Sequence, residues 1–371
     1  MSEKPVGASG RVAYMTEPGK MEIREYPLPT ELEPGALLLE VLQTNVCGSD
    51  IHVFGGHHPL LKRGGLGHEM VGKIIGLGEK VVTDSAGTPV REGDRIVPVY
   101  TAVCHACENC DRGVFNHCDH GFDYFGRSDV APYFHGATFS THYYLHPNQP
   151  FYHVPDAVPD AAAAGANCAL SQVLHGLDRA DVTVGDVVAI QGAGGLGLFA
   201  AAVAKERGAR VLVMDRIESR LENARRFGAD EVINVDQMPA LDDRVAAIQK
   251  FAGTQGADVV VEVTGIPDVF AEGISYLRPA GKFVVMGTIS PGQTTAFDPG
   301  LMVRKSAQIL AINRYPPHYL RDSLQFLERF GDKYPFAELS SRNFTLEEAE
   351  TALDLSAKRE IQRAAIVPAD R

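Results

Sequence analysis

Four cysteines are spaced closely enough to bind one metal ion together. They follow the pattern C-x2-C-x2-C-x7-C on a stretch rich in Gly, Asn, Asp and His. Four thiolates this close suit a closed, tetrahedral zinc site, which can hold together a loop that has no hydrophobic core of its own. An iron–sulfur cluster also takes four cysteines, but the proline that often follows the last of them is missing here. The spacing therefore predicts a structural zinc on Cys104, Cys107, Cys110 and Cys118.

Three further residues form a second candidate metal site. Cys47 lies in a loop that also carries a hydroxyl, a carboxylate and an imidazole, and loops hold such groups for chemistry more often than for packing. Cys168 is the thiol left to pair with it. Two sulfurs and the imidazole of His68 make a Cys2His set, the donor set of a catalytic zinc whose fourth position is open. Taken singly, a cysteine like Cys168 is more often a small buried apolar residue.

A glycine-rich stretch over residues 187–215 could bind a dinucleotide. It reads strand, glycine turn, helix, second strand and acidic residue without a gap. In G-x-G-x-x-G the first glycine permits a tight turn, the second lets a pyrophosphate approach, and the third lets the helix pack on its strand. Asp215 lies where a carboxylate accepts the adenosine ribose hydroxyls and repels a 2′-phosphate, which favours NAD over NADP. The loop residues expected at the cofactor are Gly192, Gly194, Gly195, Leu196 and Gly197.

Two kinds of secondary structure must position these groups. Apolar and polar residues alternate over residues 11–44, and strand-like residues return over 138–154, which predicts a half-buried, mainly-β region. From residue 187 onward, strand and helix segments alternate, which predicts a parallel, doubly wound sheet. The carboxyl ends of parallel strands meet at one edge of such a sheet, so Val263 and Met286 are expected to border the nicotinamide.

Length and composition describe an ordinary globular protein. A chain of 371 residues exceeds what one hydrophobic core usually supports, so we expect two domains. With 45% hydrophobic and 22% charged residues there is no sign of disorder, and no apolar run approaches the roughly 20 residues of a membrane helix. The first residues lack the apolar core of a secretory signal, which predicts the cytoplasm. A net charge of −12 argues against nucleic acid or an anionic membrane as partner.

Together, these motifs resemble the zinc-dependent alcohol dehydrogenases of the medium-chain dehydrogenase/reductase superfamily. They occur in the family's order over nearly the whole chain: Cys47-Gly48-Ser49-Asp50-Ile51-His52, Gly67-His68-Glu69, the four-cysteine lobe, Cys168 and the dinucleotide fingerprint. The resemblance implies an α/β protein with a GroES-like, mainly-β catalytic domain split around a Rossmann domain, the active site lying in the cleft. The implied ranges are 1–169 and 311–371 for the catalytic domain, about 100–120 for its structural-zinc lobe, and 170–310 for the Rossmann domain.

The same resemblance implies roles for single residues. Cys47, His68 and Cys168 become the ligands of a catalytic zinc; the third ligand is commonly glutamate in the polyol dehydrogenases of the superfamily, so the cysteine is more similar to the alcohol dehydrogenase branch. Ser49 looks like the hydroxyl that takes the alcohol proton. His52 looks like the far end of a relay that passes the proton through the nicotinamide ribose to solvent.

Other implied roles concern charged residues near the metal and the cofactor. Asp50 resembles a carboxylate that orients the histidine ligand, and Glu69 an acid near the metal. Arg363 occupies roughly the place of a pyrophosphate-binding arginine, and Arg220 that of a basic residue at the adenosine ribose. Arg216 directly follows the acidic residue of the fingerprint and could offset its charge. Four aromatic residues are either pocket walls or ordinary core residues: Tyr100, Phe54, Tyr133 and Phe134.

The activity implied by the resemblance is hydride transfer between a primary or secondary alcohol and NAD, giving the aldehyde or ketone. The implied cofactors are NAD and two zinc ions per chain, and the implied assembly is a homodimer or homotetramer. Two alternatives stay open: an NADP-preferring aldehyde or ketone reductase of the same superfamily, and a nucleotide-binding relative without turnover. The intact Cys47, His68 and Cys168 set argues against the second.

Overall fold

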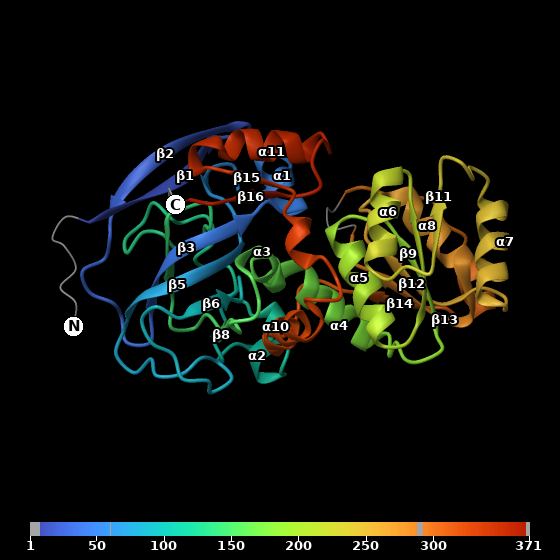
Figure 1. Cartoon of the computed structure of the whole chain (residues 1–371), viewed down its shortest axis with the longest axis horizontal. Helices are drawn as coiled ribbons and strands as arrows, with labels where there is room; N and C mark the ends of the chain where they lie inside the picture. The colour runs from blue at the N-terminus through green and yellow to red at the C-terminus, as the bar shows by residue number, and fades with distance from the viewer. Residues whose placement is uncertain (1–7, 60, 288–291, 369–371) are drawn as a thin grey trace. The chain divides into compact units, whose positions relative to one another are not determined.

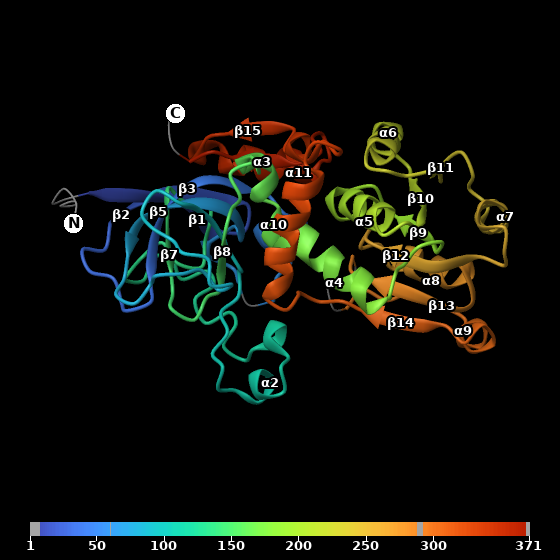
Figure 2. The ribbon, with the colours of Figure 1, turned by 60° about the horizontal axis from the view of Figure 1, so that its bottom comes forward.

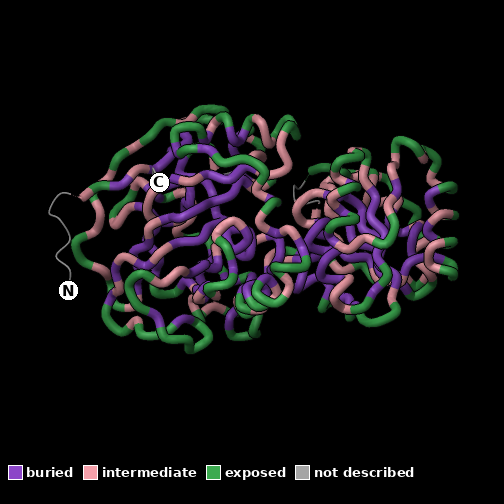
Figure 3. The backbone as a smooth tube through the Cα atoms, viewed as in Figure 1, coloured by how far each residue is buried: buried purple, intermediate pink, exposed green. Residues whose placement is uncertain are grey.

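The chain forms two compact units, each described here by itself (Figure 1). The computed structural model describes residues 8–59, 61–287 and 292–368. The first unit runs up to Cys168 and takes in most of the chain after Pro316, and the second unit is Ala169–Tyr315 with Asp332–Pro335. In both, buried residues run through the middle and exposed residues lie on the outside (Figure 3).

The first unit is built around two sheets. The smaller has the order β2-β1-β4, and the larger has the order β15-β16-β3-β5-β6-β8, with β7 added to β3. The larger sheet is largely antiparallel, and its central pair is β3 with β5 (Figure 1). The strands are β1 (Ser9–Glu17), β2 (Lys20–Pro27), β3 (Leu37–Asn45), β4 (Gly64–Gly65), β5 (Glu69–Leu77), β6 (Arg95–Pro98), β7 (His142–Leu145), β8 (Phe151–His153), β15 (Arg342–Phe344) and β16 (Ala364–Ile366).

Short helices and turns surround these sheets. Helix α11 packs beside α1 and β16, and a core that includes Phe54, Phe344 and Leu353 lies among these elements. Figure 2 shows the lobe that carries α2 standing apart from the sheets of this unit. The helical elements are α1 (Gly48–Phe54), α2 (Glu108–Asp111), η1 (Phe115–His117), α3 (Asp160–Ala163), η2 (Ala166–Leu170), α10 (His318–Phe330), η3 (Phe336–Leu339), η4 (Leu346–Glu348) and α11 (Ala349–Ala357).

The second unit is a six-stranded parallel sheet with the order β11-β10-β9-β12-β13-β14. Its inner strands β9 and β12 are mostly apolar and buried, as in a parallel sheet whose two faces are covered by helices. The order reverses between β9 and β12, and the carboxyl edge at such a switch point is where this fold binds ligands. The strands are β9 (Val187–Gln191), β10 (Arg210–Asp215), β11 (Glu231–Asn234), β12 (Ala257–Glu262), β13 (Leu277–Val285) and β14 (Gln308–Ala311).

The described residues of this unit form six helices in two groups. Helix α5 contacts α4 and α6, and helix α8 contacts α7 and α9. This arrangement confirms the predicted doubly wound fold. None of the described helices of the chain is both long and apolar enough to span a membrane. The six helices are α4 (Ser171–Arg179), α5 (Gly195–Glu206), α6 (Glu218–Arg226), α7 (Leu241–Ala252), α8 (Pro267–Tyr276) and α9 (Pro299–Lys305).

Two local features would be hard to read from the sequence. The alanine-rich run after Pro159 forms α3, the π-helical turn η2 and α4, with Gly165 between the first two and the side chain of Asn167 fully buried. Strand β14 is an edge strand whose four residues are mostly exposed and show no apolar alternation.

Candidate metal centres and cofactor site

Cys47, His68 and Cys168 come together from distant parts of the first unit. Strands β3 and β5 pair in a register that sets Asn45 opposite Glu69, so Cys47 just after β3 and His68 just before β5 lie at one edge of the sheet. Cys168 arrives on the turn η2. The two sulfurs, a ring nitrogen of His68 and a carboxylate oxygen of Glu69 lie within 4.8 Å of one another.

The buried carboxylate of Asp50 fixes two members of this group. Its Oδ2 accepts the backbone N–H of Cys47 at 2.9 Å, where α1 begins, and its Oδ1 lies 3.2 Å from Nδ1 of His68. With Nδ1 engaged, Nε2 of His68 is the nitrogen left to bind a metal. The structure thus places Asp50 beside His68, and its role in orienting a metal ligand stays a prediction.

Helix α1 also carries the two residues of the expected proton relay. Ser49 and His52 are three residues apart, so they lie on one face of the helix. Both are half-buried, and the ring of His52 stacks on His57 with 5.1 Å between ring centroids. Burial, and then His57 and His58, lower the pKa of His52. A lowered pKa keeps the imidazole neutral and able to accept a proton near neutral pH.

Glu69 is completely buried and forms an ion pair with Arg363. The guanidinium reaches it from the residue before β16, past Gly165, where an added Cβ would lie 3.2 Å from Arg363 Nη1. The second carboxylate oxygen, Oε1, has no hydrogen-bond partner among the described residues. This ion pair was not anticipated, because Arg363 was expected at the pyrophosphate, and that contact stays a prediction.

Asn167 is a further positioning residue that the sequence reasoning did not use. Its Nδ2 donates to the carbonyl oxygens of His68 at 2.8 Å and Pro98 at 2.9 Å. The residue next to Cys168 is thereby tied to the backbone of His68. A signal was present, since one asparagine inside an alanine-rich, apolar run must find buried partners.

The electrostatics of the cluster favour one ionised thiol. The hydrogen bond from Cys168, and then His68, hold the pKa of Cys47 well below its usual range despite burial. The hydrogen bond with Cys47, and then burial, raise the pKa of Cys168. Burial opposes charging of His68, but Asp50 outweighs it and raises the His68 pKa. Burial raises the pKa of Glu69 to about 8, against the opposing effect of Arg363.

The distances between sulfurs fit zinc at both cysteine sites. Two thiolates on a tetrahedral zinc, each about 2.3 Å from the metal, lie about 3.8 Å apart. In the catalytic candidate the two sulfurs are 3.9 Å apart. In the four-cysteine lobe the sulfurs of Cys104 and Cys110 are 3.9 Å apart, and those of Cys107 and Cys118 are 4.0 Å apart. The thiols are therefore already spaced for a common ion.

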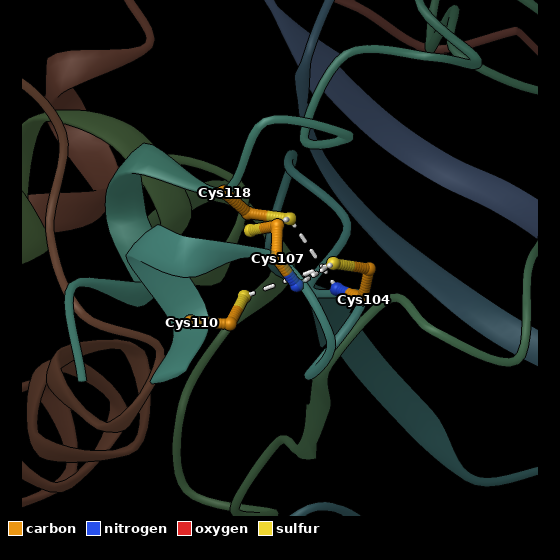
Figure 4. A group of neighbouring side chains, drawn as sticks. All are labelled: Cys104, Cys107, Cys110 and Cys118. Carbon is orange, nitrogen blue, oxygen red and sulfur yellow. Dashed lines mark hydrogen bonds between the residues drawn. The ribbon is translucent and has the colours of Figure 1, made fainter. Parts of the chain in front are cut away.

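The four thiols of the lobe point toward one another (Figure 4). Cys107 directly precedes α2, and Cys110 lies within this helix. Cys104 and Cys118 lie outside it, Cys118 directly after η1. Backbone N–H groups of Ala106 and Cys107 donate to Cys104 Sγ, and that of Cys104 donates to Cys118 Sγ. Among the residues that the structure describes, the small apolar cluster around these sulfurs consists of the cysteines with Val103 and Phe115, so the lobe has almost no apolar core.

The glycine loop after β9 has the shape that a dinucleotide needs. Gly192 has φ +109°, a conformation that favours glycine. A Cβ on Gly197 would lie 1.9 Å from the carbonyl oxygen of Gly192, so only glycine fits there. A Cβ on Gly194 would meet nothing within 4 Å, which leaves an open approach to the loop. Gly195 and Leu196 follow as the first residues of α5, whose free N–H groups favour an anion.

Asp215 ends β10 beside this loop. Its Oδ2 accepts the N–H of Ala193 at 2.8 Å, and its Oδ1 accepts those of Arg216 and Ile217 at 2.8 and 3.0 Å. These bonds hold the carboxylate in place at the carboxyl edge of the sheet. Arg220 lies on the following helix, α6.

The two residues expected at the nicotinamide also lie at this edge. Val263 directly follows β12 and Met286 directly follows β13, on neighbouring strands. Backbone bonds run from Val263 N–H to Gln191 and from Met286 N–H to Glu262. Val263 is half-buried and Met286 is buried.

Of the four aromatic residues that were expected to be either pocket walls or ordinary core residues, one lies at the metal candidate and three fit the core. Tyr100 lies edge-on to the ring of His68, with centroids 5.3 Å apart, so it belongs to the surroundings of the metal candidate. Phe54 and Phe134 are buried, and Tyr133 stacks on another tyrosine, which favours the core interpretation for these three.

Family models match both halves of the chain. Residues 33–156 match the alcohol dehydrogenase GroES-like domain, and residues 195–329 match the zinc-binding dehydrogenase domain. A 5-exo-hydroxycamphor dehydrogenase of Pseudomonas putida is 33% identical over 93% of this chain and 95% of its own. The chain belongs to the zinc-type alcohol dehydrogenases of the medium-chain dehydrogenase/reductase superfamily. It is accordingly an oxidoreductase that acts on alcohols, and its fold is GroES-like plus Rossmann.

Other members of the family are similar over the full length. A probable alcohol dehydrogenase of Mycobacterium tuberculosis is 33% identical over 94% of both chains. The crystal structure of an alcohol dehydrogenase from Thermotoga maritima superimposes with a TM-score of 0.90, covering 98% of this chain and all of that one at 26% identity. The family and the four-cysteine cluster together support zinc as a cofactor.

Proposed function

We propose that this dehydrogenase uses a catalytic zinc and NAD to interconvert primary or secondary alcohols with aldehydes or ketones. The observation that carries the proposal is the convergence of Cys47, His68 and Cys168, with Asp50 holding two of them. Zinc on these three side chains would supply a Lewis acid for the alcohol or carbonyl oxygen, and NAD would supply the hydride acceptor.

The chain's own residues provide the proton path and the geometry. The Ser49 hydroxyl takes the proton of the alcohol, and His52 accepts it and releases it to solvent. Asp50 keeps His68 in one orientation, and the buried pair of Glu69 with Arg363 holds an acid beside the ligands without leaving its charge uncompensated.

The cofactor half of the proposal rests on the Rossmann unit. The glycine loop and the start of α5 bind the pyrophosphate, and Asp215 binds the adenosine ribose. Its negative charge disfavours a 2′-phosphate, so NAD is the proposed cofactor. Arg220 and Arg363 are proposed as additional contacts to NAD, Arg216 as a contact to the 2′-phosphate in the NADP alternative, and Val263 and Met286 as the nicotinamide border.

Three further statements complete the proposal. Each chain binds two zinc ions, the second one structural, on the four-cysteine lobe. The enzyme works in the cytoplasm as a homodimer or homotetramer. The alternative is an NADP-preferring aldehyde or ketone reductase of the same superfamily.

A substrate screen tests the proposal. Purified enzyme is mixed with primary, secondary and cyclic alcohols and with NAD or NADP, and the reduced cofactor is followed by absorbance. Hydroxycamphor belongs in the screen because the Pseudomonas putida relative is named for it. We expect turnover with NAD, lost in Cys168→Ser. Turnover that persists in Cys168→Ser would contradict the catalytic zinc, and a preference for NADP would contradict the cofactor assignment.

A further inference from the structure

The side chain of Arg216 is the nearest cation in sequence to the cofactor-selecting carboxylate of Asp215. Its backbone N–H donates to Asp215 Oδ1, so the two residues share one turn. A free guanidinium at this position would attract the phosphate that Asp215 repels. The direction in which the Arg216 side chain is held therefore bears on whether NADP can bind.

The structure gives Arg216 another partner, Asp236. Nε lies 3.3 Å from Asp236 Oδ2 and Nη2 lies 3.1 Å from Oδ1, so both carboxylate oxygens are engaged. The side chains are 61% and 55% exposed, so the ion pair forms in water and competes directly with any dissolved anion. Asp236 also raises the pKa of Arg216, as expected for a paired guanidinium.

The position of Asp236 is set by the neighbouring strand. Strands β10 and β11 are parallel and in register, with Asp215 opposite Asn234. Asn234 Oδ1 accepts the N–H of Asp236 at 3.1 Å, and Asn234 Nδ2 donates to Glu218 Oε2 at 2.8 Å. The turn after β11 thus holds Asp236 beside the end of β10, on the edge where the ribose is proposed to bind.

We propose that Asp236 is a cofactor-specificity residue that holds the Arg216 guanidinium away from the 2′-phosphate of NADP. The inference rests on the proposed binding of the adenosine ribose at Asp215. Asp215 disfavours the phosphate by its own charge, and Asp236 withdraws the adjacent guanidinium of Arg216, which would otherwise compensate for it. An exposed ion pair is worth at most a factor of about five, so Asp236 adjusts the preference that Asp215 sets.

The test measures the dissociation constants of NADH and NADPH through the fluorescence of the bound nicotinamide, without any substrate. The variants are Asp236→Asn, Arg216→Gln and the double variant. Glu231→Gln is the matched control, because it removes one exposed negative charge at the opposite end of β11. Each protein is titrated at low and at high salt, since screening weakens an exposed pair.

We expect Asp236→Asn to lower the ratio of the NADPH to the NADH dissociation constant about three- to fivefold at low salt, and less at high salt. The double variant and Glu231→Gln should keep the parent ratio. If Asp236→Asn leaves the ratio unchanged, or if the double variant lowers it as much as Asp236→Asn does, the inference is wrong. Either result would leave the proposed function standing. A parent protein that binds neither NADH nor NADPH would overturn the proposed function and the inference with it.

Discussion

Nδ1 of His68 lies 3.2 Å from Oδ1 of Asp50, whose other oxygen accepts the N–H of Cys47. A single buried carboxylate therefore orients one proposed zinc ligand and positions the backbone of another. An amide has only one accepting oxygen, so Asn at this position cannot accept both the Cys47 N–H and the His68 Nδ1–H. Asp50→Asn should therefore weaken zinc binding at this site about 10- to 100-fold. Competition with a chromophoric chelator measures this loss.

The control for Asp50→Asn is Asp84→Asn. Asp84 is also buried, and its carboxylate accepts the N–H groups of Ala86, Thr88 and His153. This change should lower stability and leave zinc affinity as it is. Equal losses of zinc in the two variants would mean that general destabilisation, and not the contact with His68, releases the metal.

Replacing one partner of the buried pair Glu69–Arg363 should lower the stability of the protein more than replacing both partners. Arg363→Met leaves the buried Glu69 side chain without its partner. At a pH above the Glu69 pKa of about 8, where the carboxylate is charged, this change should lower the free energy of unfolding by about 3 kcal/mol, whereas Glu69→Gln with Arg363→Met should cost less. Denaturant unfolding of the parent, both single variants and the double variant gives the coupling energy. Additive effects in this cycle would show that the pair does not act as a unit.

His146 should make the protein less stable in mild acid. Its Nε2 lies 2.8 Å from Nδ1 of His135, and burial, then His135, lower the pKa of His146 to about 4. An unfolded histidine titrates near pH 6.5, so the unfolded state binds the proton more tightly and stability falls as the pH drops from about 6.5 toward 4. Above this window the effect is absent.

The variant His146→Gln tests this pH dependence. The free energy of unfolding of the parent should fall more steeply between about pH 6.5 and 5 than that of His146→Gln, by up to about 1.4 kcal/mol per pH unit. The control is His318→Gln, which changes an exposed histidine and should keep the parent's slope. Identical slopes for parent and His146→Gln would show that another group dominates.

The proton relay predicts a loss of rate that an added base can restore. His52→Gln should keep zinc content and NAD binding but slow alcohol oxidation at neutral pH about 10- to 100-fold, because water substitutes only partly for the imidazole. Since the pKa of His52 is lowered, the parent's rate should rise with pH at a midpoint below the usual histidine value. Ser49→Ala should be more damaging. Full activity of His52→Gln, under conditions where an isotope effect shows chemistry to be rate-limiting, would contradict the relay.

Local spacing made much of this molecule predictable from its sequence. In the four-cysteine lobe and in the glycine loop, the important residues are close together in the sequence. Their spacing therefore predicts that they are also close together in the structure. The parallel sheet followed from apolar strands that alternate with helices. Its order, with the reversal beside β9, agrees with the fold that the fingerprint at Gly192 and Gly197 predicts.

Contacts set by strand register were not predictable in the same way. The pairing of Glu69 with Arg363 depends on the register of three strands, because Asn45 of β3 lies opposite both Ala365 of β16 and Glu69 of β5. The pairing of Arg216 with Asp236 depends on the register of β10 and β11, which sets Asp215 opposite Asn234. The bond from Asn167 to His68 depends on the π-helical turn, which sequence periodicity does not reveal. Long-range polar partners therefore needed the structure.

The two cysteine sites should differ in what their loss affects. Cys110→Ser removes a ligand from a lobe that has almost no apolar core, so it should lower the melting temperature and release one zinc. Cys168→Ser should release the other zinc and abolish turnover with a smaller effect on stability. Thermal unfolding of both variants beside the parent checks this, and an unchanged melting temperature in Cys110→Ser would contradict the structural role.

The most direct test of the two-site account is the zinc content per chain, measured by elemental mass spectrometry on freshly purified parent and Cys168→Ser, with alcohol turnover assayed on the same samples. The account predicts two zinc ions in the active parent and one in an inactive Cys168→Ser. One zinc or none in an active parent, or two zinc ions with full turnover in Cys168→Ser, would contradict it.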